Sequence, residues 1–193
     1  MLSSRVRPLL VLVSGKPGSG KTILARLLAD SLALPLVSRD AFKNGLAETR
    51  GVSDHAGMTT ATLTSVDVFY GVTLYLLQAG VSLIAEQSFR RGLDERHILR
   101  LMTQAGMVRV HCQTSNEAAQ RRFVAREQPQ RSDRYWMQGA GNIIVQMEQS
   151  TFDWAVFEPL DVDVPLLSVD TTHRYQPDLE SIAAFCRTAV LDR

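Results

Sequence analysis

Residues 9–22 (LLVLVSGKPGSGKT) constrain the fold more than any other part of the chain. Their first five residues form an apolar run that is too short for a helix, which predicts a parallel strand buried on both faces. Three glycines follow, and they allow backbone N–H groups to approach an anion closely. The next run, ILARLLADSLAL, predicts a helix whose N-terminus points at the same place. The sequence therefore predicts a strand, an anion-binding loop and a helix in succession.

The loop carries the spacing GxxxxGKT, which is specific for triphosphate binding when it stands between a strand and a helix. We expect Lys21 to reach the β- and γ-phosphate oxygens, and the Thr22 hydroxyl to bind Mg²⁺. The predicted cofactors are ATP and Mg²⁺. The residues predicted to bind them are Gly15, Lys16, Pro17, Gly18, Ser19, Gly20, Lys21 and Thr22.

Composition favours a single domain with a small partner. The chain has 193 residues, 45% of them apolar, and no linker-like stretch, which predicts one domain over residues 1–193. A net charge of +1 provides no broad basic surface, so neither nucleic acid nor a membrane is the expected partner. Cys112 and Cys186 lie in apolar runs at no metal-ligand spacing, which indicates reduced core residues and a cytoplasmic protein. No segment is expected to span a bilayer, and the oligomeric state is left open.

Strands and helices alternate along the rest of the chain. Apolar runs predict further strands at 34–38, 81–86, 107–112 and 164–169, and helical spacing predicts helices at 58–78, 93–104, 114–126, 142–154 and 177–190. Leu63 belongs to the apolar stripe of the first of these helices, and Thr114 with Glu117 predicts a capping box. A helix is expected to begin near Ala41, followed by a mobile polar stretch at 48–57. This alternation predicts an α/β fold, a three-layer α/β/α sandwich with a parallel sheet of about five strands.

Two carboxylates follow predicted strands, where a parallel sheet gathers its ligands. Glu86 closes the third strand and is expected to hold Mg²⁺ through water. Asp40 follows the second strand, where it can accept the proton of an attacking hydroxyl. The alternatives are a solvated strand end for Glu86 and a helix N-cap for Asp40, which is compatible with the catalytic role.

Arginines gather in the second half of the chain. Arg122 and Arg126 lie four residues apart on one predicted helix face, and Arg131 and Arg134 follow. Such a group can close over a triphosphate, so we expect a lid near 127–138, with Arg126 acting on the transferring charge and Arg122 on the nucleotide. The alternative is a solvated basic helix face.

These motifs together resemble a known family of kinases. Residues 15–22, 38–43 (SRDAFK), 83–92 (LIAEQSFRRG), 110–112 and 121–126 (RRFVAR) are similar to the P-loop kinases that include chloramphenicol phosphotransferase, zeta toxin and polynucleotide 5′-kinase. The resemblance covers most of the chain and implies a fold of the P-loop NTPase type. It also implies that Asp40 is the general base, that Lys43 contacts the acceptor or its phosphate, and that the lid arginines are Arg122 and Arg126. Glu86 stands where polynucleotide kinases have an aspartate.

The expected activity is ATP-dependent transfer of the γ-phosphate to a hydroxyl of a small molecule. No basic groove accompanies the acceptor side, which separates the chain from polynucleotide kinases. Two alternatives stay open, namely a nucleotide-dependent switch that hydrolyses ATP slowly and a kinase acting on 5′-hydroxyls of nucleic acid. The sequence holds no NKxD motif, which disfavours a GTPase.

Overall fold

A parallel sheet forms the centre of the molecule, as predicted. The computed structural model describes residues 7–127 and 143–191. In these residues five strands pair in parallel in the order β2-β3-β1-β4-β5. The strands are β1 Leu9–Gly15, β2 Leu36–Ser38, β3 Leu83–Glu86, β4 Gly106–Gln113 and β5 Leu166–Asp170. The predicted α/β class is confirmed. That residues 1–193 form a single domain stays a prediction.

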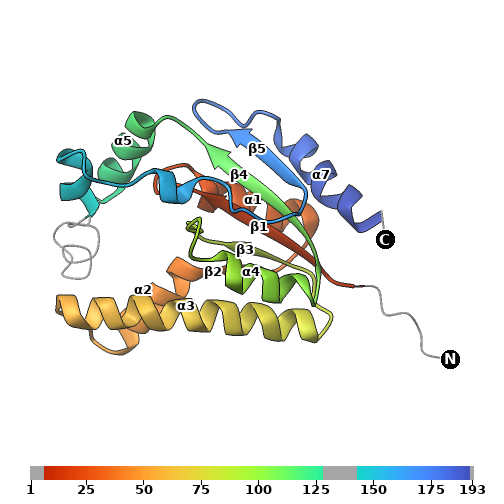
Figure 1. Cartoon of the computed structure of the whole chain (residues 1–193), viewed down its shortest axis with the longest axis horizontal. Coiled ribbons are helices and arrows are strands. Elements are labelled where there is room, and N and C mark those ends of the chain that lie inside the picture. Colours follow the sequence, from red (N-terminus) through yellow and green to blue (C-terminus); the bar gives the residue numbers. More distant parts are fainter. Residues whose placement is uncertain (1–6, 128–142, 192–193) are drawn as a thin grey trace.

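Helices cover both faces of this sheet, which gives three layers (Figure 1). Helices α1 and α7 share a core with one face, and α3 and α4 share a core with the other. Helix α2 packs along α3. The helices are α1 Lys21–Leu32, α2 Arg39–Thr49, α3 His55–Gln78, α4 Glu95–Met102, α5 Asn116–Glu127 and α7 Leu179–Leu191, with a 3-10 turn η2 Ala155–Phe157.

The two cores alternate along the central strand. All seven residues of β1 are buried, which is why its first five residues, 9–13, are all apolar. Val11 and Val13 face α1 and α7, while Leu10 and Leu12 face α3 and α4. The two cysteines are free and buried, as predicted.

The stretch at 48–57 is more regular than expected. Helix α2 runs to Thr49 and α3 already begins at His55, because Asp54 caps it by accepting a hydrogen bond from the Gly57 N–H at 2.7 Å. The irregular part of the predicted stretch is therefore limited to residues 50–54. The predicted stripe is also wrong at Leu63, which is exposed, because the side of α3 that packs against the core carries Ala61 and Ser65.

Among the described helices, α3 alone is long and apolar enough to cross a membrane by length and composition. This differs from the expectation that no segment has that character. Phe69, Tyr70 and Leu77 of α3 are nevertheless buried in the core beside the sheet.

The second half of the chain departs from prediction at its helix ends. Helix α5 is capped by Ser115, whose hydroxyl accepts from the Ala118 N–H at 3.1 Å, so the predicted capping box at Thr114 is off by one residue. Of the helix predicted at 142–154, the described residues 143–154 are helical over 143–148. Arg131, Arg134 and the lid predicted at 127–138 lie, apart from Glu127, outside the described residues.

Candidate active site

The loop between β1 and α1 has the shape that its glycines predict. Gly18 and Gly20 have φ angles of +80° and +84°, a region that other residues rarely adopt. A Cβ on Gly18 would lie 2.1 Å from the carbonyl oxygen of Ala119, so this position also requires glycine for space. Helix α1 begins at Lys21, directly after Gly20, and its first N–H groups have no partner within the helix. The loop and the helix N-terminus therefore have the geometry of an anion-binding site.

The loop is anchored by a threonine that lies far away in the sequence. The buried hydroxyl of Thr171 lies 2.6 Å from the carbonyl oxygen of Ser19 and 3.0 Å from that of Gln113. Arg122 in turn donates to the carbonyl oxygens of Thr171, at 2.9 Å, and of Thr172. Arg122, predicted to contact the nucleotide, therefore holds the segment that anchors the phosphate loop.

Lys21 and Glu86 are both buried beneath the loop. Lys21 is 6% exposed and Glu86 is 1% exposed. Burial lowers the pKa of the Lys21 ammonium below its usual value, although the negative charges of Glu86 and Asp40 partly offset this effect. A buried ammonium at a helix N-terminus is a strong binding group for a phosphate oxygen.

Hydroxyl groups hold both oxygens of the Glu86 carboxylate. Thr22 Oγ1 donates to Oε1 at 3.1 Å, and Ser38 Oγ donates to Oε2 at 2.7 Å. These oxygen donors are the kind that Mg²⁺ prefers. The described residues contain no group of three or more His, Cys, Asp or Glu side chains that could form a metal cage by themselves. These groups fit Mg²⁺ bound by Thr22, by phosphate oxygens and by water next to Glu86, which stays a prediction.

Asp40 lies at the same end of the sheet, in the first turn of α2. The N-cap of this helix is Ser38 and not Asp40, so the alternative role of Asp40 as a cap is wrong. The carboxylate contacts Arg39 at 3.1 Å and Lys43 at 3.9 Å, and its side chain is 52% exposed. It is therefore open to an incoming molecule.

Positive charge keeps Asp40 ionised. Partial burial raises the pKa of the Asp40 carboxyl, but Arg39 and Lys43, with smaller contributions from Lys21 and Arg126, outweigh it, and the pKa lies below its usual value. For Lys43, burial is the largest influence and lowers the pKa of the ammonium, while Asp40 opposes it. Asp40 is a carboxylate at neutral pH, as a group that is to accept a proton from a hydroxyl must be.

Arg126 lies near the end of α5, close to this group of charges. Its charge lowers the pKa values of both Lys21 and Asp40, which places it within electrostatic range of the two. Its Nε donates to Oε1 of Glu127 at 2.9 Å, and its side chain is 53% exposed. Glu127 is 2% exposed, so the exposed arginine is tied to a buried carboxylate.

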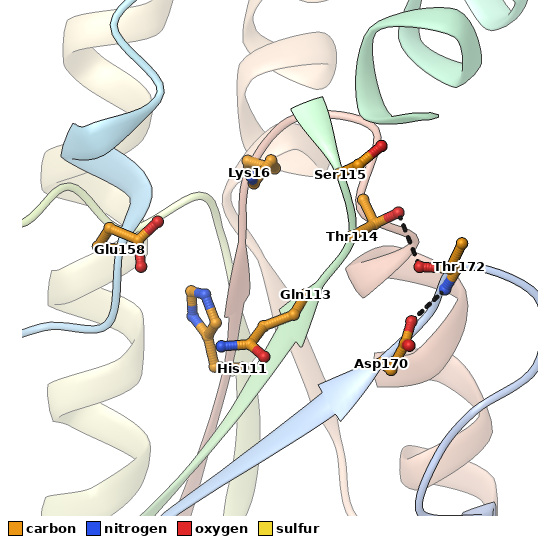
Figure 2. Close-up of a pocket in the computed structure, with 8 residues that line it drawn as sticks. All are labelled: Lys16, His111, Gln113, Thr114, Ser115, Glu158, Asp170 and Thr172. Atoms are coloured by element: carbon orange, nitrogen blue, oxygen red, sulfur yellow. Dashed lines mark hydrogen bonds between the residues drawn. The ribbon is translucent and has the colours of Figure 1, made fainter. Parts of the chain in front are cut away.

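A polar cavity of about 390 Å³ lies beside the phosphate loop (Figure 2). His111 lines it, and its Nδ1 lies 2.8 Å from the hydroxyl of Ser14. Burial, together with the charges of Lys16 and Arg109, lowers the pKa of His111 to about 4, so the ring is neutral at neutral pH. The residues that line the cavity are Lys16, His111, Gln113, Thr114, Ser115, Glu158, Asp170 and Thr172. It lies at the ends of β4 and β5 and is separate from the site of Asp40 and Glu86, which borders β2 and β3.

Comparison with known proteins agrees with this geometry. A model of the AAA_33 family, described as an AAA domain, matches residues 10–139. This range covers the phosphate loop, Asp40, Glu86 and Arg126. The chain belongs to the AAA_33 family.

Solved structures extend the comparison beyond that match. A candidate kinase from Chloroflexus aurantiacus J-10-fl has 30% sequence identity and a TM-score of 0.80, with 95% of this chain and 98% of that chain covered. Two further structures share the fold at low identity. A gluconokinase from Sinorhizobium meliloti 1021 has 15% identity, a TM-score of 0.50 and coverage of 97% and 94% of the two chains. The PezAT toxin–antitoxin system of Streptococcus pneumoniae has 14% identity, a TM-score of 0.56 and coverage of 99% and 90%.

The AAA_33 match and these structures confirm the predicted resemblance to P-loop kinases. The AAA_33 match and the Chloroflexus aurantiacus structure support a phosphotransferase of the kinase type and imply nucleotide binding.

The structure brings most of the predicted site residues together. Lys21, Thr22 and Glu86 adjoin one another, Asp40 and Lys43 lie beside them on α2, and Arg126 acts on them electrostatically. Lys16 is different, because its side chain turns away from this group. Its Nζ donates to Oδ1 of Asn116 at 2.6 Å and lies 5.6 Å from the ring centroid of Trp154.

Sequence reasoning missed Ser38, Thr171 and Glu127. Ser38 ends a predicted strand, and a polar residue at a strand end is a signal that could have identified it. The part that Thr171 plays depends on which strand pairs with β4, and no local pattern reveals that pairing. Glu127 was placed at the border of the predicted lid and had no signal of its own.

Proposed function

We propose that this protein is an ATP-dependent kinase that transfers the γ-phosphate of ATP to a hydroxyl group of a small molecule. The observation that carries the proposal is the position of Asp40. Its ionised, half-exposed carboxylate stands at the strand ends, and it lies close enough to Lys21 for each charge to shift the pKa of the other. An acceptor hydroxyl bound at Asp40 would lie next to the γ-phosphate held by the loop.

The phosphate loop and Lys21 bind the triphosphate in this proposal. Backbone N–H groups at the start of α1 and the buried ammonium of Lys21 together provide directed donors and a positive charge. Binding of the phosphate would also raise the pKa of Lys21 toward its ordinary value, because the negative charge of the phosphate stabilises the buried ammonium.

Thr22 and Glu86 would hold Mg²⁺, Thr22 by direct contact and Glu86 through water. When bound, the metal supplies positive charge to the β- and γ-phosphate oxygens. The contribution of the protein is orientation. Glu86 accepts a hydrogen bond from the Thr22 hydroxyl, so the lone pairs of the Thr22 oxygen would be turned toward the place where the metal binds.

The first task of Asp40 in this proposal is to orient the acceptor hydroxyl. Its lowered pKa makes it a weak base, and a loose transition state for phosphoryl transfer requires little proton removal before the new bond forms. We infer that Asp40 aligns the hydroxyl through a hydrogen bond and receives its proton as the oxygen bonds to phosphorus. Lys43 lies beside it and would contact the acceptor or the phosphate that it receives.

Arg126 would stabilise the charge of the transferring group. In the structure its side chain is paired with Glu127, and its charge already reaches Lys21. In this proposal Arg126 exchanges its contact with Glu127 for one with the γ-phosphate. An arginine used in this way contributes mainly in the transition state.

A small acceptor agrees with the charge of the chain. The net charge is +1, so no overall field attracts a nucleic acid. The name of the gluconokinase from Sinorhizobium meliloti states a small acceptor for that protein, which shares only the fold with this chain. Localisation in the cytoplasm stays part of the proposal.

A screen of hydroxyl compounds tests the proposal. Purified protein is incubated with Mg-ATP and each compound, stimulated ADP release is measured, and the product is examined by mass spectrometry for one added phosphoryl group. Lys21→Ala serves as the inactive control. ADP release that no compound stimulates would favour the nucleotide-dependent switch, and transfer of label to a 5′-hydroxyl oligonucleotide would favour the nucleic-acid kinase.

A further inference from the structure

Strand register explains why Glu86 has two hydroxyl partners. Ser38 is the last residue of β2 and Glu86 the last residue of β3, and the two are directly paired in the parallel register. Side chains at paired positions on neighbouring strands emerge on the same face. The Ser38 hydroxyl consequently reaches Oε2 of Glu86 at 2.7 Å, while Thr22 reaches Oε1 from the other side.

The Ser38 side chain does not cap its own helix while it makes this contact. It is the N-cap residue of α2, with the extended backbone typical of that position, at φ −116° and ψ 125°. A serine at an N-cap normally accepts a hydrogen bond from a backbone N–H of the first turn. Ser38 makes no such side-chain bond, whereas Ser115 makes one at the start of α5. The Ser38 hydroxyl is directed toward Glu86 instead of toward its own helix.

We propose that Ser38 is a positioning residue that fixes the Glu86 carboxylate for the water shell of Mg²⁺. The inference rests on the proposed function, and it adds a residue outside the phosphate-loop motif to the metal site. With Ser38 on one oxygen and Thr22 on the other, the plane of the buried carboxylate is fixed, and its remaining lone pairs point in set directions. Outer contacts of this kind change metal affinity by roughly 10- to 100-fold in other sites.

The same contact links the metal side of the site to the acceptor side. Ser38 is followed by α2, and Asp40 lies in the first turn of that helix. The hydrogen bond between Ser38 and Glu86 thus ties the start of α2 to the end of β3. Losing it would leave the Glu86 carboxylate held by Thr22 alone and would remove the side-chain contact between β3 and the start of α2.

The test measures metal binding directly, so it does not depend on finding the acceptor. Mn²⁺ serves as the probe, and its binding to the protein with ATP is followed by water-proton relaxation. Affinity for ATP without metal is measured by calorimetry. Ser38→Ala is expected to weaken Mn²⁺ binding by roughly 10-fold or more and to leave metal-free ATP binding unchanged. Ser38→Thr retains the hydroxyl and is expected to restore wild-type Mn²⁺ affinity.

Ser115→Ala is the matched control, because the same change there removes a true helix cap. It is expected to lower thermal stability and to leave Mn²⁺ affinity unchanged. If Ser38→Ala does not fold, Ser38→Cys, a weaker donor of similar size, is measured in its place and is also expected to weaken Mn²⁺ binding. Wild-type Mn²⁺ affinity in the folded variant would overturn the role of Ser38. Failure of the acceptor screen with weakened Mn²⁺ binding would reject the kinase proposal alone.

Discussion

Gly18→Ala tests whether the phosphate loop requires glycine at this position, both for space and for its backbone conformation. The added Cβ would lie 2.1 Å from the carbonyl oxygen of Ala119 and 2.8 Å from its carbonyl carbon, both backbone atoms of α5. A non-glycine residue at φ +80° also costs about 1–2 kcal/mol. Overpacking adds about 1–3 kcal/mol. We therefore expect the free energy of unfolding to fall by about 2–5 kcal/mol.

Relief of this clash must move either α5 or the loop, and both movements misalign the N–H groups that bind phosphate. A single charge-assisted hydrogen bond is worth about 1.5–3 kcal/mol, so Mg-ATP affinity should fall by roughly 10- to 100-fold. Urea denaturation measures the first effect and calorimetry the second. Gly20→Ala is a graded comparison, since its Cβ meets only Thr171 Cβ at 3.9 Å and the backbone cost remains.

Gly45→Ala is the matched control on helix α2. Within the described part of the chain nothing lies within 4 Å of the added Cβ, so alanine should stabilise the protein by about 0.5–1 kcal/mol through its helix propensity. It should leave Mg-ATP affinity unchanged. A Gly18→Ala variant as stable as the wild type and with the same affinity for Mg-ATP would refute the packing argument.

Three further predictions concern ionisable side chains. Lys21→Ala should weaken Mg-ATP binding in calorimetry and abolish turnover, because it removes the buried ammonium of the site; unchanged affinity and turnover would reject the phosphate-loop assignment. Arg126→Ala should leave Mg-ATP affinity nearly unchanged and lower kcat by roughly 10³-fold, and an unchanged kcat in steady-state kinetics would show that this arginine is only a solvated helix residue. The pKa of His111 is about 4 in the folded protein against 6.5 unfolded, so its contribution to stability is complete above pH 6.5 and is lost as the pH falls toward 4. Between pH 7 and 4.5 the wild type should lose about 2–3 kcal/mol more than His111→Gln in urea denaturation, and equal losses would contradict the neutral buried ring.

The order of strands and helices could be predicted because each element carries its own signal. The apolar run of β1 and the spacing of GxxxxGKT are local patterns, and together they predicted the loop. Parallel pairing then required Asp40 and Glu86 to share one edge of the sheet, which the structure bears out. The helical spacing of α3 likewise predicted a helix, although it misplaced Leu63.

The remaining features depend on contacts that no local pattern encodes. Thr171 reaches Ser19 only because β5 pairs with β4, and Ser38 reaches Glu86 only because of the register between β2 and β3. The alternative role of Asp40 as a cap was wrong because Asp and Ser are both good N-caps, and composition does not tell which of them the backbone uses. Pairing and register therefore set the limit of what could be predicted.

The rate of phosphoryl transfer by Asp40→Asn tests the central proposal most directly. Asparagine keeps the shape of the side chain but cannot accept a proton as a carboxylate does. Folding and Mg-ATP affinity, measured first, should match the wild type. Transfer to the acceptor identified in the screen, followed by product mass, should fall by roughly 10²- to 10⁴-fold. A transfer rate within a few-fold of the wild type would remove Asp40 from the reaction and contradict the proposed mechanism.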